Sequence, residues 1–514
     1  MIDTELILVN TGFFNNQSTG QAGALGISGT KSAQILNCTF VNNSAQGHGG
    51  ALYIQANALI GNCLFKGNNT IGGVGEAIQI YGATTLVDAR NNVLFGNGTD
   101  DQVHKTSGNF NDFNNYIVKN GTDNNLIGNQ PLNSLLFGLR SSHVTDGYGL
   151  KYFTIVDNSS LLIDNGNDFT GSPTFDCRRA PRLINGIIDV GPVEYTPFRI
   201  TSNDFTHAEG LDQVLMLAST GPDLTNYIEF DIENFNTTSN LIAFNSEINL
   251  TKSVYIDGYS QNGSAISGPS TNGTSGVTPA SNLIKLTQTS GAVSYAFRGE
   301  VSDVTIVGFN IYGFENQGIS SYISATNLKV FGNHIGFRPN GADFISDENK
   351  IHGILVQGSN AIIGGSQHWK RNVLSCNGQT GASIFNANIN IAGGVGTGDN
   401  VQIIGNIIGL KPDGINSFNL PVGPSSGISK KSTSTGVING LTIGNEQHLG
   451  GNVISGNQDN GILLEEIGSG CKINNNLIGL NFDGSIGVSN KSNGLKLTSC
   501  SNEVRVGGIK GNVI

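Results

Sequence analysis

Two groups of side chains near the N-terminus combine residue types that acid–base chemistry uses. Asp88 and Arg90 are separated by one residue, so in a strand both would lie on the same face. Asp100 and Asp101 are followed closely by His104 on a polar stretch that we expect to form a loop. Carboxylates that converge on Ca²⁺ and a basic group that accepts a proton could together support proton abstraction. Both groups are therefore candidate catalytic or metal sites.

The densest group of charged side chains lies further along the chain and consists of Asp164, Asp176, Arg178, Arg182, Asp189 and Glu194. Such a group could be a catalytic cluster. It could also be an ion-paired plug that closes the end of a stack of strands, because an open end exposes unpaired strand groups and must be covered. We favour the plug.

The six cysteines lie far apart and form no Cys-x-x-Cys spacing, so the sequence does not favour a zinc site. Cys38 and Cys63 fall at equivalent positions of neighbouring repeats, and we assign Cys471 and Cys500 in the same way. Equivalent positions on stacked strands lie about 4.8 Å apart, which is within the Cα range of a disulfide. Because parallel side chains do not readily reach the disulfide torsion, we expect buried stacked thiols, and a disulfide in either pair stays open.

The composition excludes several kinds of protein. The chain has 514 residues, too many for one compact core, and only 13% of them are charged. It is rich in Asn and contains 72 Gly, both poor helix formers that suit tight turns with positive φ. The net charge of −11 argues against nucleic-acid binding, which needs a basic stripe. No apolar run approaches the roughly 18 residues of a membrane span.

Both ends of the sequence look as if they were cut through repeat units. Residues 1–5 lack the basic start and the apolar core of a signal peptide. Residues 511–514 stop inside a phrase that recurs earlier in the chain. We therefore expect this chain to be a fragment of a longer protein.

Residues 1–105 contain a short repeat. A phrase of the type Phe-x-x-Asn recurs at intervals of 25 to 29 residues, beginning at Phe13, Phe40, Phe65 and Leu94. We expect each repeat to be one turn of a β-coil, in which three short strands pair in parallel with the same strands of the next turn. The four residues that begin the phrase should stack in one interior column. Two further columns should consist of stacked amides, which can hydrogen-bond along the column: Asn16, Asn43, Asn68 and Asn97 in one, and Asn37, Asn62 and Asn91 in the other.

A longer repeat occupies the C-terminal part. The phrase Asn-x-Ile-Gly ends at Gly336, Gly409 and Gly479, which are 73 and 70 residues apart. A fixed period of this length indicates a solenoid in which each copy holds two or three turns. Residues 301–514 should therefore form a second coil. The acidic residues Asp413 and Asp483 stand where another copy has Asn340, so we interpret them as turn formers.

The short repeat also defines the surroundings of Asp88 and Arg90. The positions expected to stack against this pair hold Gln34 and Leu36, then Leu59 and Gly61. No ladder of acids builds up, so we favour a structural role for the pair. The group Asp100, Asp101 and His104 stays an alternative candidate.

Two sets of phrases resemble a known group of proteins. The Phe-x-x-Asn phrases and the Gly-Gly-Ala-Leu phrase of residues 49–52 resemble the repeats of polymorphic outer-membrane adhesins and related right-handed parallel β-helix proteins of the pectate-lyase-like superfamily. Residues 160–195 resemble the terminal signature of bacterial β-helix proteins with a choice-of-anchor region, although Pro192 replaces the usual Ala. The resemblance implies a right-handed parallel β-helix with a capped end, displayed outside a bacterial cell.

The Gly-His-Gly phrase at residues 47–49 matches a motif of polygalacturonases, which are also β-helices. In those enzymes, the resemblance implies several aspartates before the motif and an Arg-Ile-Lys phrase after it. Neither is present here. We therefore interpret His48 as part of a Gly-rich turn that precedes a strand.

A helix is expected between the two coils. Thr206 and Glu209 have the spacing of a capping box, and four apolar residues follow at helical spacing: Leu211, Val214, Leu215 and Ala218. We expect residues 206–219 to form a helix that covers the first turn of the second coil. The segment resembles the helix that opens other bacterial β-helix units, with Asp212 where Arg is usual.

These features predict an all-β protein with two tandem right-handed parallel β-helix solenoid units and a short helical cap between them. The units are residues 1–197, with a terminal capping region, and residues 198–514. We expect a non-catalytic secreted or cell-surface protein with an adhesive or structural role, without a catalytic residue, metal or cofactor. Its expected partners are a carbohydrate or a host or cell-surface protein. The alternative is a polysaccharide lyase or glycoside hydrolase, because this fold hosts many such enzymes.

Overall fold

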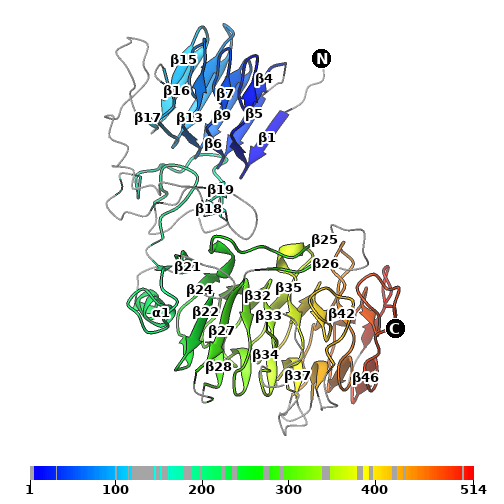
Figure 1. Ribbon diagram of the computed structural model, residues 1–514. Helices are drawn as coiled ribbons and strands as arrows, with labels where there is room; N and C mark the ends of the chain where they lie inside the picture. The colour runs from blue at the N-terminus through cyan, green and yellow to red at the C-terminus, as the bar shows by residue number, and fades with distance from the viewer. Residues whose placement is uncertain are drawn as a thin grey trace. The chain divides into compact units, whose positions relative to one another are not determined.

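Figure 1 shows the computed structural model of the chain. It describes residues 5–29, 32–98, 101–113, 115–117, 144–145, 151–152, 155, 160, 162–178, 187–196, 198–220, 226–233, 240–269, 277–281, 283–289, 291, 293–338, 348–378, 386–392, 398–419, 425–431, 436–500 and 503–514. Among these residues no helix is both long and apolar enough to span a membrane. The chain divides into two compact units: Met1–Thr145 with Gly149–Pro197, and Asp146–Tyr148 with Phe198–Ile514.

Unit 1 contains a coil of parallel strands in four sheets, in which successive strands of a sheet come from successive turns (Figure 1). Sheet A contains β1 (Glu5–Val9), β5 (Ser32–Leu36), β9 (Asn57–Gly61), β13 (Leu86–Arg90) and β16 (Asn109–Phe113). Sheet B contains β2 (Gly12–Phe14), β6 (Thr39–Val41), β10 (Leu64–Lys66), β14 (Val93–Phe95) and β17 (Tyr116–Ile117). Sheet C contains β3 (Gln17–Ser18), β7 (Ser44–Ala45) and β11 (Asn69–Thr70). Sheet D contains β4 (Leu25–Ile27), β8 (Leu52–Ile54), β12 (Ile78–Ile80) and β15 (Val103–Lys105). The parallel coil expected for this region is confirmed.

Sheet C was not expected, because the repeat predicts three strands per turn and the first three turns have four. Each of its two-residue strands begins directly after the asparagine that ends a Phe-x-x-Asn phrase. The backbone N–H of Ser44 donates to the carbonyl of Asn16 at 2.9 Å, and that of Asn69 donates to Asn43 at 3.0 Å. The asparagines hold consecutive corners close enough for one further short strand to pair.

The first residues of the four Phe-x-x-Asn phrases stack in one interior column, as predicted. Phe13 pairs in register with Phe40, Phe40 with Phe65, and Phe65 with Leu94. The rings are parallel, with centroids 5.0 Å apart between Phe13 and Phe40 and 4.7 Å apart between Phe40 and Phe65. No single turn can bury these side chains, so the stacking of turns provides the core.

The first asparagine column is a hydrogen-bonded ladder, as predicted, and it is buried at Asn43, Asn68 and Asn97. The Nδ2 atom of Asn16 donates to Asn43 Oδ1 at 2.9 Å, Asn43 donates to Asn68 at 2.9 Å, and Asn68 donates to Asn97 at 2.7 Å. Each Oδ1 also accepts a backbone N–H of the preceding turn. The amides therefore satisfy backbone groups that the sharp corners leave without a strand partner.

Unit 2 is a coil with three sheets and three strands per turn (Figure 1). Sheet E contains β20 (Arg199–Ile200), β21 (Asn226–Phe230), β24 (Val254–Asp257), β29 (Val304–Val307), β32 (Lys329–Phe331), β35 (Ile362–Gly364), β38 (Gln402–Ile404), β41 (Thr442–Ile443), β44 (Cys471–Ile473) and β47 (Val504–Val506). Sheet F contains β22 (Leu241–Phe244), β27 (Ile284–Gln288), β30 (Phe309–Ile311), β33 (His334–Ile335), β36 (Val373–Leu374), β39 (Ile407–Ile408), β42 (Val453–Ile454) and β45 (Leu477–Ile478). Sheet G contains β23 (Ile248–Leu250), β28 (Tyr295–Gly299), β31 (Gln317–Ser321), β34 (His352–Val356), β37 (Ala387–Ile391), β40 (Ser426–Lys430), β43 (Ile462–Glu465) and β46 (Leu495–Thr498).

Two antiparallel strand pairs and two 3₁₀ turns lie outside these parallel sheets. Two antiparallel pairs join β18 (Val144–Thr145) to β19 (Lys151–Tyr152) and β25 (Gly268–Pro269) to β26 (Val277–Thr278). Two 3₁₀ turns, η2 (Gly258–Ser260) and η4 (His368–Lys370), follow strands of sheet E. The pair β25–β26 and the two 3₁₀ turns are excursions from the unit 2 coil, which keeps its strand order through them. The pair β18–β19 follows β17, the last described strand of the unit 1 coil.

Each copy of the long repeat holds two turns, which lies within the predicted range. Gly336, Gly409 and Gly479 follow β33, β39 and β45, and one turn separates each from the next. Gly336 has φ of 101° and Gly409 has φ of 98°. A Cβ on Gly409 would lie 2.2 Å from the carbonyl oxygen of Ser455. Both the backbone angle and this close approach require glycine at the position.

The helix of unit 2 is α1 (Leu211–Thr220), which packs against β20 and β23 at the start of the coil. Its buried residues are those of the predicted stripe, Leu211, Val214, Leu215 and Ala218. They join the core that runs through sheets E, F and G. The helix therefore covers the interior that the first turn would otherwise expose, as Figure 1 shows.

The predicted start of this helix is wrong. The helix begins at Leu211, five residues after Thr206, and the first helical hydrogen bond runs from Val214 N–H to the carbonyl of Gly210 at 3.0 Å. Thr206 Oγ1 instead donates to Asp204 Oδ1 at 3.1 Å, and Glu209 accepts a hydrogen bond from Thr201. Here the hydrogen bonds of short polar side chains stabilise turns, which compete with an earlier start of the helix.

The segment between the unit 1 coil and unit 2 lies along the flank of that coil. Its described parts, residues 162–178 and 187–196, pack Leu162 and Val190 against the outward side chains of sheet B: Val41, Leu64, Val93 and Phe95. We call these two stretches the strap. The strap therefore reaches across the second, third and fourth turns. The prediction of a plug across the end of the coil is wrong for the described residues, because these bury apolar side chains against the outer face of sheet B.

Candidate functional site

The Gly-His-Gly phrase forms a structural turn. The backbone N–H of Val74 donates to His48 Nδ1 at 3.1 Å, which ties one turn of the coil to the next. Gly49 has φ of 72°, and a Cβ there would lie 2.3 Å from the carbonyl oxygen of Leu52. The phrase is therefore explained by the backbone path.

Asp88 and Arg90 lie in β13 and stack as the repeat predicts. Asp88 pairs in register with Leu59, and Arg90 pairs with Gly61. On the other side, Asn111 Nδ2 donates to Asp88 Oδ1 at 2.6 Å, and the Arg90 guanidinium lies 4.3 Å from the ring centre of Phe113. The acid and the base thus have separate partners and do not converge on a common point.

Asp101 and His104 do converge. His104 Nδ1 lies 2.8 Å from Asp101 Oδ2, and Asp101 is buried with its Oδ1 lacking a hydrogen-bond partner. This pair has the carboxylate–imidazole geometry that orients a general base. Asp100 lies outside the described residues.

An acid that the sequence did not single out lies next to this pair. Glu76 is buried, and its backbone N–H donates to the carbonyl of Asp101 at 2.7 Å. Its Oε2 accepts the backbone N–H of Thr70 at 2.5 Å. The available signal was the change from Gly-Gly-Ala-Leu at residues 49–52 to Gly-Glu-Ala-Ile at residues 75–78, which breaks a glycine column with an acid.

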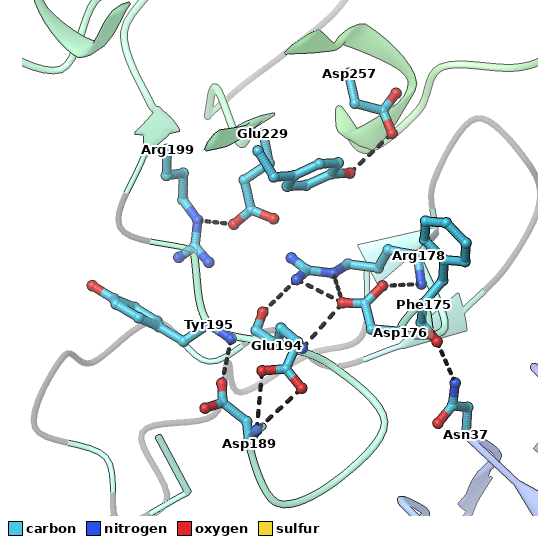
Figure 2. A network of polar contacts seen from close by, with 11 residues as sticks. Asn37, Phe175, Asp176, Arg178, Asp189, Glu194, Tyr195, Arg199, Glu229 and Asp257 are labelled. Atoms are coloured by element: carbon cyan, nitrogen blue, oxygen red, sulfur yellow. Dashed lines mark hydrogen bonds and ion pairs between the residues drawn. The ribbon is translucent and has the colours of Figure 1, made fainter. Parts of the chain in front are cut away.

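Four charged residues of the strap form one buried network (Figure 2): Asp176, Arg178, Asp189 and Glu194. The Asp164 side chain is exposed. Arg178 Nε donates to Asp176 Oδ2 at 2.8 Å, and its Nη2 donates to the carbonyl of Glu194. Asp176 also accepts the backbone N–H groups of Arg178 at 2.8 Å and of Glu194 at 3.0 Å. The ion pair therefore fixes two separate stretches of the strap at once.

The other two carboxylates continue the network. Glu194 accepts the backbone N–H of Asp189, at 3.1 Å and 3.0 Å from its two oxygens. Asp189 accepts the backbone N–H of Asp164 at 2.7 Å. It also accepts the backbone N–H of Tyr195, as Figure 2 shows. Buried carboxylates that accept backbone N–H groups hold chain segments together. Arg182 lies outside the described residues.

The strap is fastened to the coil by the second asparagine column. Asn37 Nδ2 donates to the carbonyl of Phe175 at 2.8 Å, and Asn91 Nδ2 donates to the carbonyl of Asn167 at 2.8 Å. Within the column, Asn91 Nδ2 donates to Asn62 Oδ1 at 3.1 Å. The predicted hydrogen bonding along the column is present only between Asn62 and Asn91, because Asn62 Nδ2 donates to Ser172 Oγ and Asn37 Oδ1 has no partner. The column mainly anchors the strap.

The cysteines are free thiols. Cys38 and Cys63 stack as expected, and the backbone N–H of Cys38 donates to Cys63 Sγ at 3.4 Å. A side-chain hydrogen bond with Cys63 is the main reason why the pKa of Cys38 lies below its ordinary value. The assignment of Cys471 and Cys500 to one column is wrong, because Cys471 pairs in register with Val504.

A groove with a cavity volume of about 240 Å³ runs beside α1. Its lining includes Asp212, Glu247, Lys252 and Asn226. Asn226 is buried, its Nδ2 donates to the carbonyl of Ala218 at 2.6 Å, and its Oδ1 lacks a partner. Within the described part of the chain, no three His, Cys, Asp or Glu residues are placed to hold a metal ion.

The described residues thus define an all-β protein of the parallel β-helix class. None of the protein-family models, curated proteins and solved structures compared with this chain matches it. The functional assignment therefore rests on the contacts described above.

Proposed function

We propose that this chain is a non-catalytic β-helix protein that acts outside the cell as a rigid structural or adhesive element. The observation that carries the proposal is the use made of its acids and bases. His48, Asp176, Asp189 and Glu194 all accept backbone N–H groups, so they hold the fold together. A residue with this task is a poor acid–base catalyst, because its proton acceptor is already occupied.

Rigidity is supported by the continuous pairing of strands and amides. In unit 2 one ladder joins Asn333, Asn372, Asn406, Asn452, Asn476 and Asn512 from turn to turn. Strands β25 and β26 form an excursion from the coil between β24 and β27. Excursions positioned by a rigid scaffold are where binding residues commonly lie.

A location outside the cell is compatible with the thiols. Cys38, Cys63, Cys177, Cys376 and Cys471 are buried, and only Cys500 is partly exposed. Buried thiols react slowly with oxidants, so these cysteines could persist in an oxidising compartment. The resemblance to surface-displayed β-helix repeats supports the same location.

A second candidate function is cleavage of an extracellular polysaccharide. The observation that favours it is the contact of 2.8 Å between His104 and the buried Asp101. In this reading His104 is the proton acceptor, and Asp101 orients its ring.

The test is an incubation of the purified chain with Ca²⁺ and a panel of acidic and neutral polysaccharides. We expect no absorbance from unsaturated products and no new reducing ends, together with retention on an immobilised polysaccharide or on a cell-surface protein. Cleavage that disappears in Asp101→Asn and His104→Gln, but persists in Asp88→Asn, would contradict the non-catalytic proposal. Cleavage that persists in all three variants would indicate a contaminant.

A further inference from the structure

Arg371 interrupts a column of glycines in unit 2. In register with Arg371, two residues before the strands of sheet F, the neighbouring turns carry Gly332, Gly405 and Gly451. The recurring Gly-Asn phrase becomes Arg-Asn at this one place among them. A repeat protein can place a special side chain only by breaking a column.

The Arg371 side chain is buried with donors that have no acceptor. The residue is 3% exposed, and its Nε and Nη1 atoms form no hydrogen bond. A buried guanidinium without an acceptor is unfavourable, because it loses its hydration without replacement. Burial lowers the pKa of Arg371 to about 10.

The contact that Arg371 does make leaves those donors unused. Its guanidinium carbon lies 4.7 Å from the ring centre of Phe482. A ring stacked on a guanidinium occupies its face, whereas the N–H groups point outward in its plane. The Phe482 ring offers no oxygen or nitrogen acceptor, and Nε and Nη1 have no hydrogen bond.

The surroundings of Arg371 are basic and aromatic. Lys370 Nζ lies 5.1 Å from the ring centre of Trp369, and His368 Nδ1 is buried without a partner. Ser366 Oγ donates to Gln447 Oε1 at 2.7 Å, which joins this loop to the loop that carries His448. Burial and the charges of Arg371 and His448 lower the pKa of His368. Among the described residues, no carboxylate forms an ion pair with Arg371.

We propose that Arg371 anchors a binding site for an oxyanion, in which a carboxylate, sulfate or phosphate group accepts hydrogen bonds from the edge of the guanidinium. Two acceptor oxygens on one group match the fork of arginine donors. Lys370 and His368 supply further donors at the same corner of the coil. This site is independent of the structural or adhesive role proposed above, since either could be present without the other.

Trp369 allows a direct test, because it is the one tryptophan of the chain. Its fluorescence would be followed during separate titrations with sulfate, phosphate and acetate, with chloride adjusted to keep the ionic strength constant. We expect a saturable change with at least one anion. A preference for acetate would indicate a planar carboxylate ligand, and a preference for sulfate or phosphate would indicate a tetrahedral group.

Two variants make the assignment specific. Arg371→Met should weaken binding about tenfold or more, which corresponds to about 1.4 kcal/mol. Arg505→Met removes an exposed arginine of the same unit and should leave the titration unchanged. If Arg371→Met fails to fold by circular dichroism, Arg371→Lys keeps a charge without the fork and should still weaken binding. A wild-type protein that responds to none of the three anions, or an Arg371 variant that responds equally, would overturn the proposal and leave stacking on Phe482 as the role of Arg371.

Discussion

The two coils of this chain bury their interiors by stacking successive turns, but they use different side chains to do so. The unit 1 coil repeats every 25 to 29 residues and stacks three phenylalanines and a leucine in its interior. Unit 2 has longer and less regular turns with a mainly aliphatic core, in which Ile363, Ile403, Ile443 and Ile473 continue one column of sheet E. The covers also differ: the strap packs on the flank of unit 1, whereas α1 packs on the start of unit 2.

Both coils nevertheless contain the same buried amide ladder at a corner. Asn68 in unit 1 and Asn406 in unit 2 each accept a backbone N–H and a side-chain N–H from one neighbouring turn and donate to the amide of the next. The interior side chains can differ between the two coils, provided that all residues of one column are of a compatible type. The corner amides satisfy backbone groups, which every turn has, and this requirement does not depend on the core.

The largest expected effect concerns the helix α1, which covers the start of the unit 2 coil. Leu215→Asp places a charge in the apolar contact between α1 and the coil, where Leu215 is 8% exposed. We expect a loss of about 4 kcal/mol in the free energy of unfolding of unit 2, because the carboxylate has no partner there. Denaturant unfolding followed by Trp369 fluorescence would measure it.

The matched control is Met216→Asp, one residue further along the same helix, where the side chain is 54% exposed. It should change the stability little. Equal effects of the two variants would show that α1 does not cover the core in solution.

The next largest effect tests whether the two ladders are equivalent. Asn406→Ala and Asn68→Ala each remove an amide that bridges two turns and leave buried N–H and C=O groups without partners. We expect each to cost about 3 kcal/mol. Asn16→Ala, at the exposed end of the unit 1 ladder, should cost less than about 1 kcal/mol. Hydrogen exchange would localise the loss to one unit, and a large cost in only one unit would show that the ladders differ in importance.

The parts of this fold that could be predicted from the sequence are those that repeat. Parallel stacking puts equivalent residues in contact, so the column from Phe13 to Leu94 and the ladder of Asn43 and Asn68 are visible as periodic phrases. The sequence of the strap does not repeat. Its position depends on its packing against sheet B, which no periodic pattern in the sequence indicates. Arg371 was missed for a different reason. A break in the Gly-Asn phrase was visible, but only the structure shows that the side chain is buried without an acceptor.

Register errors were the other limit of prediction. Cys471 pairs with Val504 rather than with Cys500, because the residues between strands vary in number from turn to turn. A second amide column of unit 2 shows the same freedom. It joins Asn377, Asn388, Asn457 and Asn490, and its contact between Asn388 of β37 and Asn457, at 2.9 Å, spans 69 residues of the chain. Loop length is weakly constrained in a solenoid, whereas the contacts between turns are strongly constrained.

The smallest expected effect separates the coils by acid sensitivity. His334 and His352 both lie in unit 2 and are buried, and burial lowers the pKa of each to about 4. In the unfolded chain, histidine has a pKa of about 6.5. Between pH 6.5 and 4 the unfolded state therefore binds protons that the folded state does not. The stabilisation is complete above pH 6.5 and is lost as the pH falls through this window, by about 2 kcal/mol per histidine at pH 5.

The measurement is the free energy of unfolding of unit 2 at pH 7 and pH 5, followed by Trp369. His334→Phe removes a titrating ring that lies in register with Val373, and should reduce the acid-induced loss by about 2 kcal/mol. His352→Gln should act in the same way while keeping an acceptor for Asn390, whose Nδ2 lies 3.1 Å from the ring. His207→Gln, at an exposed position before α1, is the control and should leave the acid-induced loss as it is in the wild type. An acid-induced loss that survives in the double variant would place the sensitivity in other groups and remove this distinction between the two coils.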